Sequence, residues 1–292
     1  NIETKISKKP LEKKESKNKK VDIKTENTDT NEKNSYNIDV ATILNLFEGL
    51  EYNLEEVRDE KRVKPIYFTK LPKDLDTIKS VKVKKNTFIQ IVLPLIASEN
   101  ENIKKDRKYL LRIIDKERSD KENIWLKRKL KEYKVSGEDI NELLNRIDII
   151  PVSIALAQAA KESGWGTSRF ALEGNAIFGQ WTWGKRGIEP LEKTKNQTHK
   201  ILKFPILRAS IKAYVTNLNT HKSYNSFRFK RNEIRASNKQ LKGLDLIHEL
   251  NNYAQTGKVY TETLEKIIKQ NSLDDFENIV VQDNKDKNQL NL

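Results

Sequence analysis

The pattern of hydrophobic and polar positions separates this chain into a polar N-terminal segment and a long series of helical segments. Residues 1–40 are rich in Lys, Glu, Asn, Asp and Thr, a composition that buries too little apolar surface to offset the entropy lost on ordering. We therefore predict a disordered, basic, low-complexity tether there. Further along the chain, apolar residues recur at helical spacing in segments 43–52, 86–99, 110–114, 124–133, 140–147, 151–163, 210–219, 224–236, 241–250 and 261–268.

Two segments between these helices lack helical periodicity. Residues 62–71, RVKPIYFTKL, predict an extended arm because Pro65 disfavours a helix and β-forming residues follow it. Residues 176–204 combine Gly, Trp, Thr and Lys, which predicts a small β-hairpin lobe or a long ordered loop. The apolar segment 86–99 contains Pro94 and predicts a kinked core helix. The fold class that follows is mainly α with one small β lobe.

Composition narrows the possible chemistry. The 292 residues carry a formal net charge of +14, which favours polyanionic surroundings such as nucleic acid, anionic lipid or an acidic bacterial wall. The absence of Cys excludes disulfides, thiolate catalysis and zinc-finger ligands, and the three His residues lack a metal-ligand spacing such as HExxH. We predict no metal and no cofactor. No apolar run approaches the roughly 18 residues of a membrane-spanning helix.

The predicted helix 151–163 ends in a candidate catalytic carboxylate. Pro151 suits the first turn, and Gly164 suits the C-terminal end of this helix. Glu162 lies at the edge of the predicted apolar face and in the last turn, where burial and the helix dipole both raise the pKa of a carboxyl group. A general acid for glycosidic cleavage needs such a raised pKa. The alternative is an ordinary surface glutamate paired with Lys161 or Arg169.

Aromatic and amide side chains follow Glu162 closely. Sugars bind by stacking their CH faces on aromatic rings, while amides satisfy hydroxyl and acetamido groups. The candidate substrate-binding residues are Trp165, Asn175, Phe178, Gln180, Trp181 and Trp183. The alternative is a hydrophobic cluster, with at least one of the three Trp in the core.

The segment ALAQAAKESGWGTSRFALEGNAIFG resembles the signature of bacterial glucosaminidases with a lysozyme-like fold. The resemblance is to the Bax-type proteins related to mannosyl-glycoprotein endo-β-N-acetylglucosaminidase. It extends over residues 62–270 through VKPIYFTKLPKDL, FIQIVLPLI, SIKAYVTNLNTHKSY and NYAQTGKVY. It implies a lysozyme-like helical domain that cleaves the β-1,4 bond of peptidoglycan on the N-acetylglucosamine side, with Glu162 as catalytic acid.

The second catalytic group stays open between two mechanisms. An inverting mechanism needs another carboxylate about 6.5–9.5 Å away to activate water, whereas a substrate-assisted mechanism uses the acetamido oxygen of the sugar. Glu189 and Glu192 are candidates for the first mechanism, and the alternative for both is a solvated loop acid. Tyr253 and Tyr260 resemble a tyrosine pair of the family, which implies that they position a water or the acetamido group.

With this resemblance, the chain divides into four parts. We predict a tether at 1–40, an extended arm and helical extension at 41–140, a lysozyme-like glucosaminidase domain at 141–275 and a polar tail at 276–292 that frays.

The expected setting is the bacterial periplasm or cell envelope. The chain begins at Asn1, so we expect that an export signal preceded it and was removed. The expected partners are peptidoglycan glycan strands and the anionic wall surface, which the positive charge attracts. The rival hypotheses are a non-catalytic peptidoglycan-binding or scaffolding protein on the same fold, and a nucleic-acid binder. The nucleic-acid hypothesis is disfavoured because Lys residues alternate with Glu and Asp and no nucleic-acid-binding motif is present.

Overall fold

Helices dominate the part of the chain that the computed structural model describes, which comprises residues 38–182, 187–189, 200–283 and 290–292. This confirms the predicted mainly α fold class. The α-helices are α1 (Val40–Gly49), α2 (Leu54–Glu60), α3 (Val81–Ile113), α4 (Asp120–Glu132), α5 (Ile140–Arg146), α6 (Val152–Ser163), α7 (Arg169–Gly174), α8 (Leu207–Thr220), α9 (Asn225–Ala236) and α10 (Lys258–Gln270). Short 3-10 helices are η1 (Leu75–Thr77), η2 (Lys222–Tyr224), η3 (Gly243–Asp245), η4 (Ile247–Tyr253) and η5 (Leu273–Phe276).

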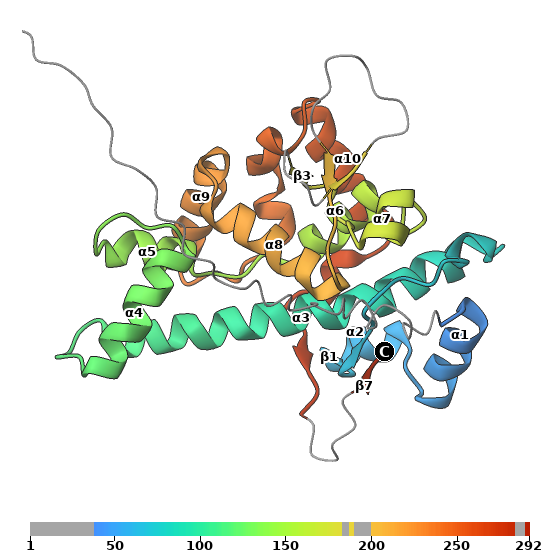
Figure 1. Ribbon diagram of the computed structural model, residues 1–292, viewed down its shortest axis with the longest axis horizontal. Helices are drawn as coiled ribbons and strands as arrows, with labels where there is room; N and C mark the ends of the chain where they lie inside the picture. The colour runs from blue at the N-terminus through green and yellow to red at the C-terminus, as the bar shows by residue number, and fades with distance from the viewer. Residues whose placement is uncertain (1–37, 183–186, 190–199, 284–289) are drawn as a thin grey trace, which may run out of the picture. The chain divides into compact units, whose positions relative to one another are not determined.

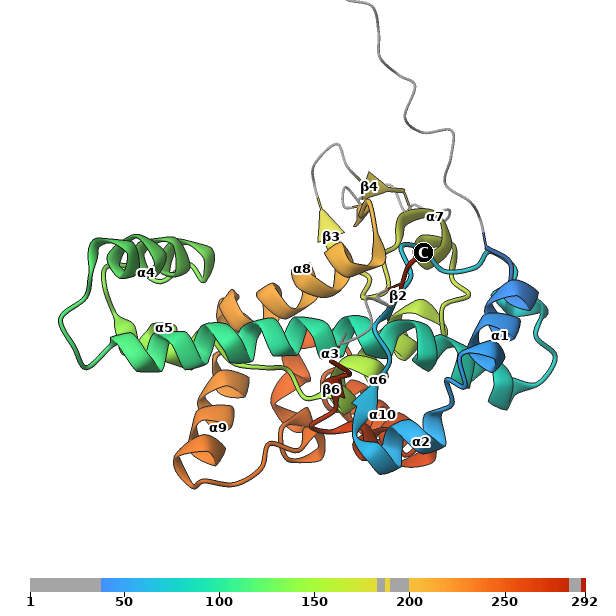
Figure 2. The same cartoon turned by 90° about the horizontal axis from the view of Figure 1, so that it is seen from below.

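Helix α3 is a single helix where the sequence predicted two, at 86–99 and 110–114. That prediction was wrong because the polar residues between the two segments stay helical. Pro94 inside the helix has no N–H to donate to the carbonyl of Gln90. The hydroxyl of Tyr52 donates to that carbonyl over 3.0 Å instead, so the buried acceptor keeps a partner. Helix α3 contacts α6 and α8 on one side and the strands of the N-terminal arm on the other (Figure 1, Figure 2).

The arm at 62–71 is extended, as predicted, and pairs with the C-terminal segment. Strand β1 (Arg62–Val63) runs parallel to β6 (Val280–Val281), and β2 (Ile66–Tyr67) runs parallel to β7 (Leu290–Asn291). The expectation that the polar tail frays was therefore wrong for these residues. Two-residue strands carry no periodicity, and the backbone supplies their hydrogen bonds, so the sequence held no signal for them.

The segment after α7 contains the predicted β lobe. Strands β3 (Trp181–Thr182), β4 (Gly187–Ile188) and β5 (Lys200–Leu202) form an antiparallel sheet in the order β3-β5-β4. The described residues thus confirm the β alternative of the two that the sequence left open.

The predicted helix 241–250 is replaced by the 3-10 helices η3 and η4. Gly243 in η3 explains part of this difference. A Cβ atom built on Gly243 would lie 2.0 Å from Oγ of Ser153, so only glycine lets this backbone approach the start of α6 so closely. Tertiary packing against α6 overrides the local helical pattern.

Helix α6 is capped from a distant part of the chain. Pro151 occupies its N-cap and provides no side-chain cap. The buried carboxylate of Glu277 accepts from the backbone N–H of Val152 over 3.0 Å and from the hydroxyl of Ser153 over 2.5 Å. It also accepts from the N–H of Gly243 over 3.1 Å. Glu277 therefore satisfies free donors at the first turn of α6, where the helix dipole favours a negative charge.

Replacing Glu277 by Gln should destabilise the protein by about 1–3 kcal/mol. The groups that face the carboxylate are N–H and O–H donors, so the amide NH2 of Gln would meet donors and lack a buried acceptor. Urea unfolding followed by circular dichroism measures the change. Glu262→Gln is the control, because Glu262 is half-exposed and its ion pair in the described part of the chain is with Lys258 at 3.6 Å. An unfolding free energy equal to that of this control would contradict the capping role.

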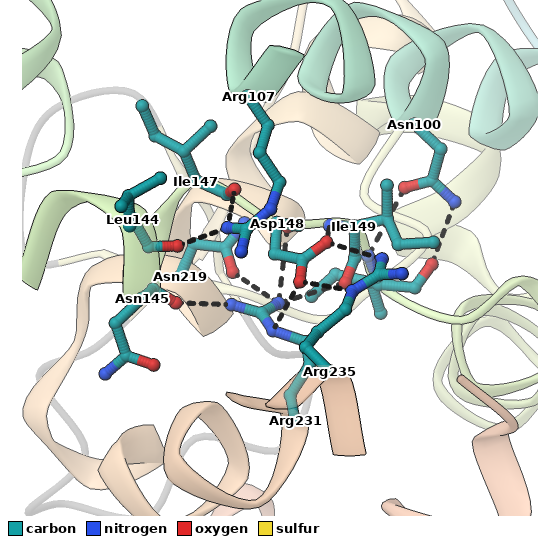
Figure 3. A network of polar contacts seen from close by, with 11 residues as sticks. Asn100, Arg107, Leu144, Asn145, Ile147, Asp148, Ile149, Asn219, Arg231 and Arg235 are labelled. Carbon is teal, nitrogen blue, oxygen red and sulfur yellow. Dashed lines mark hydrogen bonds and ion pairs between the residues drawn. The ribbon is translucent and has the colours of Figure 1, made fainter. Parts of the chain in front are cut away.

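A buried polar network joins α3, the segment before α6, α8 and α9 (Figure 3). Arg235 donates through Nε to Oδ2 of Asp148 over 3.0 Å and through Nη2 to Oδ1 over 2.9 Å. The fully buried Arg231 donates to the carbonyls of Asp148 and Ile149 and to Oδ1 of Asn219. The network fixes the segment that leads into α6 and therefore the direction of that helix.

One hydrophobic core contains buried residues from both sides of residue 140, where a domain boundary was predicted. The boundaries at 40, 140 and 275 stay predictions. Among the described helices, none combines the length and the apolar character needed to cross a membrane.

Candidate active site

Glu162 occupies the last turn of α6, where the chain turns sharply. Gly164 ends the helix with φ of +58°, and Trp165 follows with the same φ. The Glu162 side chain is half-buried. The loop after α7 crosses the carboxylate so closely that a Cβ atom built on Gly179 would lie 3.4 Å from Oε2 of Glu162.

The surroundings of Glu162 disfavour its charged form. Burial raises the pKa of this carboxyl group above its ordinary value, and the hydrogen bond from Tyr260 and the charge of Lys161 offset only part of the effect. The direction agrees with the sequence-based expectation. A carboxyl group of this kind keeps its proton closer to neutral pH than an exposed glutamate does, as a general acid requires.

A chain of buried hydrogen bonds ends on Glu162. The hydroxyl of Tyr214 donates to Oε1 of Gln158 over 2.7 Å, and Nε2 of Gln158 donates to the hydroxyl oxygen of Tyr260 over 3.0 Å. The Tyr260 hydroxyl donates in turn to Oε1 of Glu162 over 2.9 Å. Sequence reasoning missed Gln158 and Tyr214. The available signal was a Gln in an otherwise apolar helical stripe, four residues before Glu162 and hence on the same face.

The two predicted tyrosines, Tyr253 and Tyr260, lie together at this chain of hydrogen bonds. The rings of Tyr253 and Tyr260 stack with centroids 5.5 Å apart and planes inclined by 8°. Tyr253 donates its hydroxyl to the carbonyl of Phe178 over 3.2 Å, and Phe178 stacks on Tyr214 with centroids 3.8 Å apart. The structure thus brings Tyr253, Tyr260 and Phe178 together with Glu162.

A cavity of about 920 Å³ opens at Glu162. Its lining combines amide and aromatic side chains with one carboxyl group. Within the described lining, Glu162 is the only acid, and no Lys or Arg is present. The lining residues are Glu162, Phe178, Gly179, Gln180, Asn217, His221, Tyr224, Asn251, Asn252, Tyr253, Ala254, Gln255, Thr256 and Gly257. Aromatic faces and neutral amides suit a neutral, hydroxyl-rich ligand better than an anionic one.

Of three further predicted substrate-binding residues, Gln180 lies in the cavity lining, whereas Asn175 and Trp165 lie outside its described part. Gln180 lines the cavity, and its buried Oε1 has no hydrogen-bond partner among the described residues. Asn175 ends α7 with φ of +52° and donates to the carbonyl of Phe204 over 3.0 Å. Trp165 packs edge-on against Phe88. Neither Asn175 nor Trp165 is part of the described lining, and their binding roles stay predictions.

The remaining candidates lie on or near the β lobe. The backbone of Trp181 pairs with that of Ile201 in the sheet. Glu189 is exposed, pairs with Lys200 at 3.0 Å and does not belong to the described cavity lining. Trp183 and Glu192 lie outside the described residues. Within the described ranges, no group of three or more His, Cys, Asp or Glu residues is placed to hold a metal ion.

The part of the chain that contains this site is similar to known proteins. A family model described as Mannosyl-glycoprotein endo-beta-N-acetylglucosaminidase matches residues 137–273, a range that includes α6 and the whole described cavity lining. The chain is also 37% identical over 198 residues to Protein bax of Escherichia coli (strain K12). That similarity covers 65% of this chain and 71% of Protein bax. No solved structure matches the chain.

Proposed function

Because this chain belongs to the Bax-type, glucosaminidase-like family, we propose that it is a peptidoglycan hydrolase that cleaves the β-1,4 bond on the N-acetylglucosamine side of glycan strands. Family membership supports hydrolysis of glycosidic bonds in general. The observation that carries the finer proposal is Glu162, which has a raised pKa and is the single carboxyl group of the described cavity lining, among amide side chains, aromatic rings, His221 and Thr256. N-acetylated sugars present the apolar CH faces and hydrogen-bonding groups that such a lining can bind.

In the proposed mechanism, Glu162 donates its proton to the glycosidic oxygen as the bond to the anomeric carbon breaks. The hydroxyl of Tyr260 then stabilises the carboxylate that forms, through the hydrogen bond to Oε1. Gln180 supplies a buried acceptor without a described partner, which suits a sugar hydroxyl or the N–H of an acetamido group. Phe178 and Tyr253 provide aromatic surface along the same cavity.

The group that completes the reaction at the anomeric carbon is proposed to be the acetamido oxygen of the substrate. The described cavity lining holds no second carboxylate, which favours the substrate-assisted mechanism. Glu189 and Glu192 remain the candidates for an inverting mechanism, since both belong to the segment between β4 and β5. The anomeric configuration of the first-formed product separates these mechanisms, because direct attack by water inverts the configuration and the acetamido mechanism retains it.

The distribution of positive charge favours this proposal over the hypothesis of a nucleic-acid binder. The chain carries a formal net charge of +14, yet the described lining of the cavity has no Lys or Arg to contact phosphates. We propose instead that the positive charge keeps the protein near the anionic wall in the bacterial cell envelope.

Digestion of purified peptidoglycan, with mass spectrometry of the new reducing ends, tests the function. The proposal predicts fragments that end in N-acetylglucosamine. Fragments that end in N-acetylmuramic acid would contradict the bond assignment. An absence of fragments, together with undiminished binding to sacculi, would favour the non-catalytic binding protein.

The activity should fall as the pH rises through the raised pKa of Glu162, because only the protonated carboxyl group can act as the acid. In the pH profile of kcat/KM, we call the falling part at high pH the alkaline limb. We expect the midpoint of this limb to lie above about pH 4.3, the ordinary pKa of glutamate, and kcat/KM to fall about tenfold per pH unit beyond it. Glu173→Gln is the control, because Glu173 is exposed and pairs with Arg169, so its limb should match wild type. A rate that stays constant up to pH 9 would contradict the role of Glu162.

A further inference from the structure

The fully buried side chain of Gln158 makes two hydrogen bonds of opposite polarity. Its Oε1 accepts from the Tyr214 hydroxyl over 2.7 Å, and its Nε2 donates to the Tyr260 oxygen over 3.0 Å. Gln158 and Tyr214 are both 0% exposed, so water cannot substitute for either partner. Along the hydrogen bonds, Gln158 reaches Glu162 through the Tyr260 hydroxyl.

Only one orientation of the Gln158 amide gives both tyrosine hydroxyls of this hydrogen-bond chain, those of Tyr214 and Tyr260, their present acceptors. If the amide were reversed, its Nε2 would face Tyr214, whose own proton would then lack its present acceptor in the core. The Tyr260 hydroxyl would donate to Oε1 of Gln158 and would no longer donate to Glu162. An unsatisfied buried donor is costly, so Tyr214 selects the observed orientation of the amide.

We propose that Gln158 is a positioning residue that directs the single hydroxyl proton of Tyr260 to Oε1 of Glu162, with Tyr214 fixing the orientation of the Gln158 amide. The proposal rests on the proposed function of Glu162 as the acid. Because the Tyr260 donor occupies Oε1, the transferable proton resides on Oε2, the oxygen beside the cavity-lining residue Gly179. The same donor strengthens its hydrogen bond when Glu162 becomes charged, which assists proton release.

A double-mutant cycle tests whether Gln158 acts through Tyr260. Gln158→Leu should lower kcat about fivefold to tenfold and move the alkaline limb of activity to higher pH, because the Tyr260 hydroxyl loses the amide donor that orients and polarises it toward ionised Glu162. Tyr260→Phe should move the limb in the same direction. The double variant should show no further loss than Tyr260→Phe alone, because the route from Gln158 to Glu162 is already broken. Losses that multiply in the double variant would overturn the proposal.

A matched core variant separates positioning from general destabilisation. Ile154→Val changes another fully buried side chain of α6 that takes no part in the hydrogen-bond chain. It should lower stability and leave the alkaline limb in the wild-type position. If Gln158→Leu behaves as Ile154→Val does, with an unmoved limb, its role is structural and the proposal fails.

A titration of Glu162 by 13C NMR gives a readout that does not depend on activity. The Glu162 carboxyl signal, assigned with Glu162→Gln, should titrate at higher pH in Gln158→Leu than in wild type. If peptidoglycan is not cleaved by the wild type but this displacement is observed, the proposed function fails and the coupling from Gln158 to Glu162 stands. If peptidoglycan is cleaved and the titration is identical in both proteins, the positioning role alone is refuted.

Discussion

Glu162→Gln should lower kcat for peptidoglycan hydrolysis by about 10²- to 10⁴-fold, the range that general acid catalysis contributes. The substitution removes the acidic proton but keeps an oxygen that accepts from the Tyr260 hydroxyl, so the hydrogen-bond chain through Gln158 and Tyr214 stays intact. The KM should change little, because the substrate-contacting surface of the cavity is unchanged. Initial rates on purified peptidoglycan, with reducing ends quantified by mass spectrometry, measure the loss.

Two controls make this result specific to the acid. The thermal unfolding temperature of Glu162→Gln should match or exceed that of wild type, because burial raises the pKa of Glu162 and a neutral amide relieves that burial cost. Glu173→Gln, an exposed change on the adjacent helix α7, should keep wild-type activity. Retention of full activity by Glu162→Gln would eliminate Glu162 as the proton donor and direct attention to other acids.

The local sequence around Glu162 predicted some of the residues that line the cavity of the candidate site. Helical spacing placed Glu162 at the edge of the buried face, and Gly164 was correctly expected to end the helix. Tyr253 and Phe178 were identified by resemblance or by residue type, and both line the cavity with Glu162. These features depend on short stretches of sequence and on the physical preferences of single residues, so they can be found without the fold.

The parts that escaped prediction depend on contacts between distant segments. Gln158 meets Tyr260 across 102 positions, and Glu277 caps α6 across 125 positions, and neither pairing has a local pattern. The strand pairing of the arm with the C-terminal segment is equally non-local. A buried polar side chain in an apolar helix indicates that a partner exists, but only the packed structure shows which one.

The second large effect is expected in stability: Asp148→Ala should lower the free energy of unfolding by about 3–5 kcal/mol. Asp148 is 3% exposed and faces the guanidinium groups of Arg231 and Arg235 (Figure 3). Burial lowers the pKa of Arg231 to about 10, so this group stays charged at neutral pH even within the core. Removing Asp148 leaves that charge without its acidic partner, and a buried charge without compensation is strongly destabilising.

The pH dependence of unfolding tests whether the charge of the Asp148 carboxylate is the source of this stability. Burial alone would raise the pKa of Asp148, but the charge of Arg231 and the hydrogen bonds from Arg235 outweigh it, and the pKa is lowered. A lowered folded-state pKa means that this stabilisation is complete above about 3.9, the unfolded value, and is lost as the pH falls through the folded value. Urea unfolding between pH 2 and 7 should therefore show the wild type converging on Asp148→Ala at acidic pH. Glu233→Ala, which breaks an exposed pair with Lys230, should cost less than about 1 kcal/mol, and an equal cost for the two variants would contradict the buried pairing.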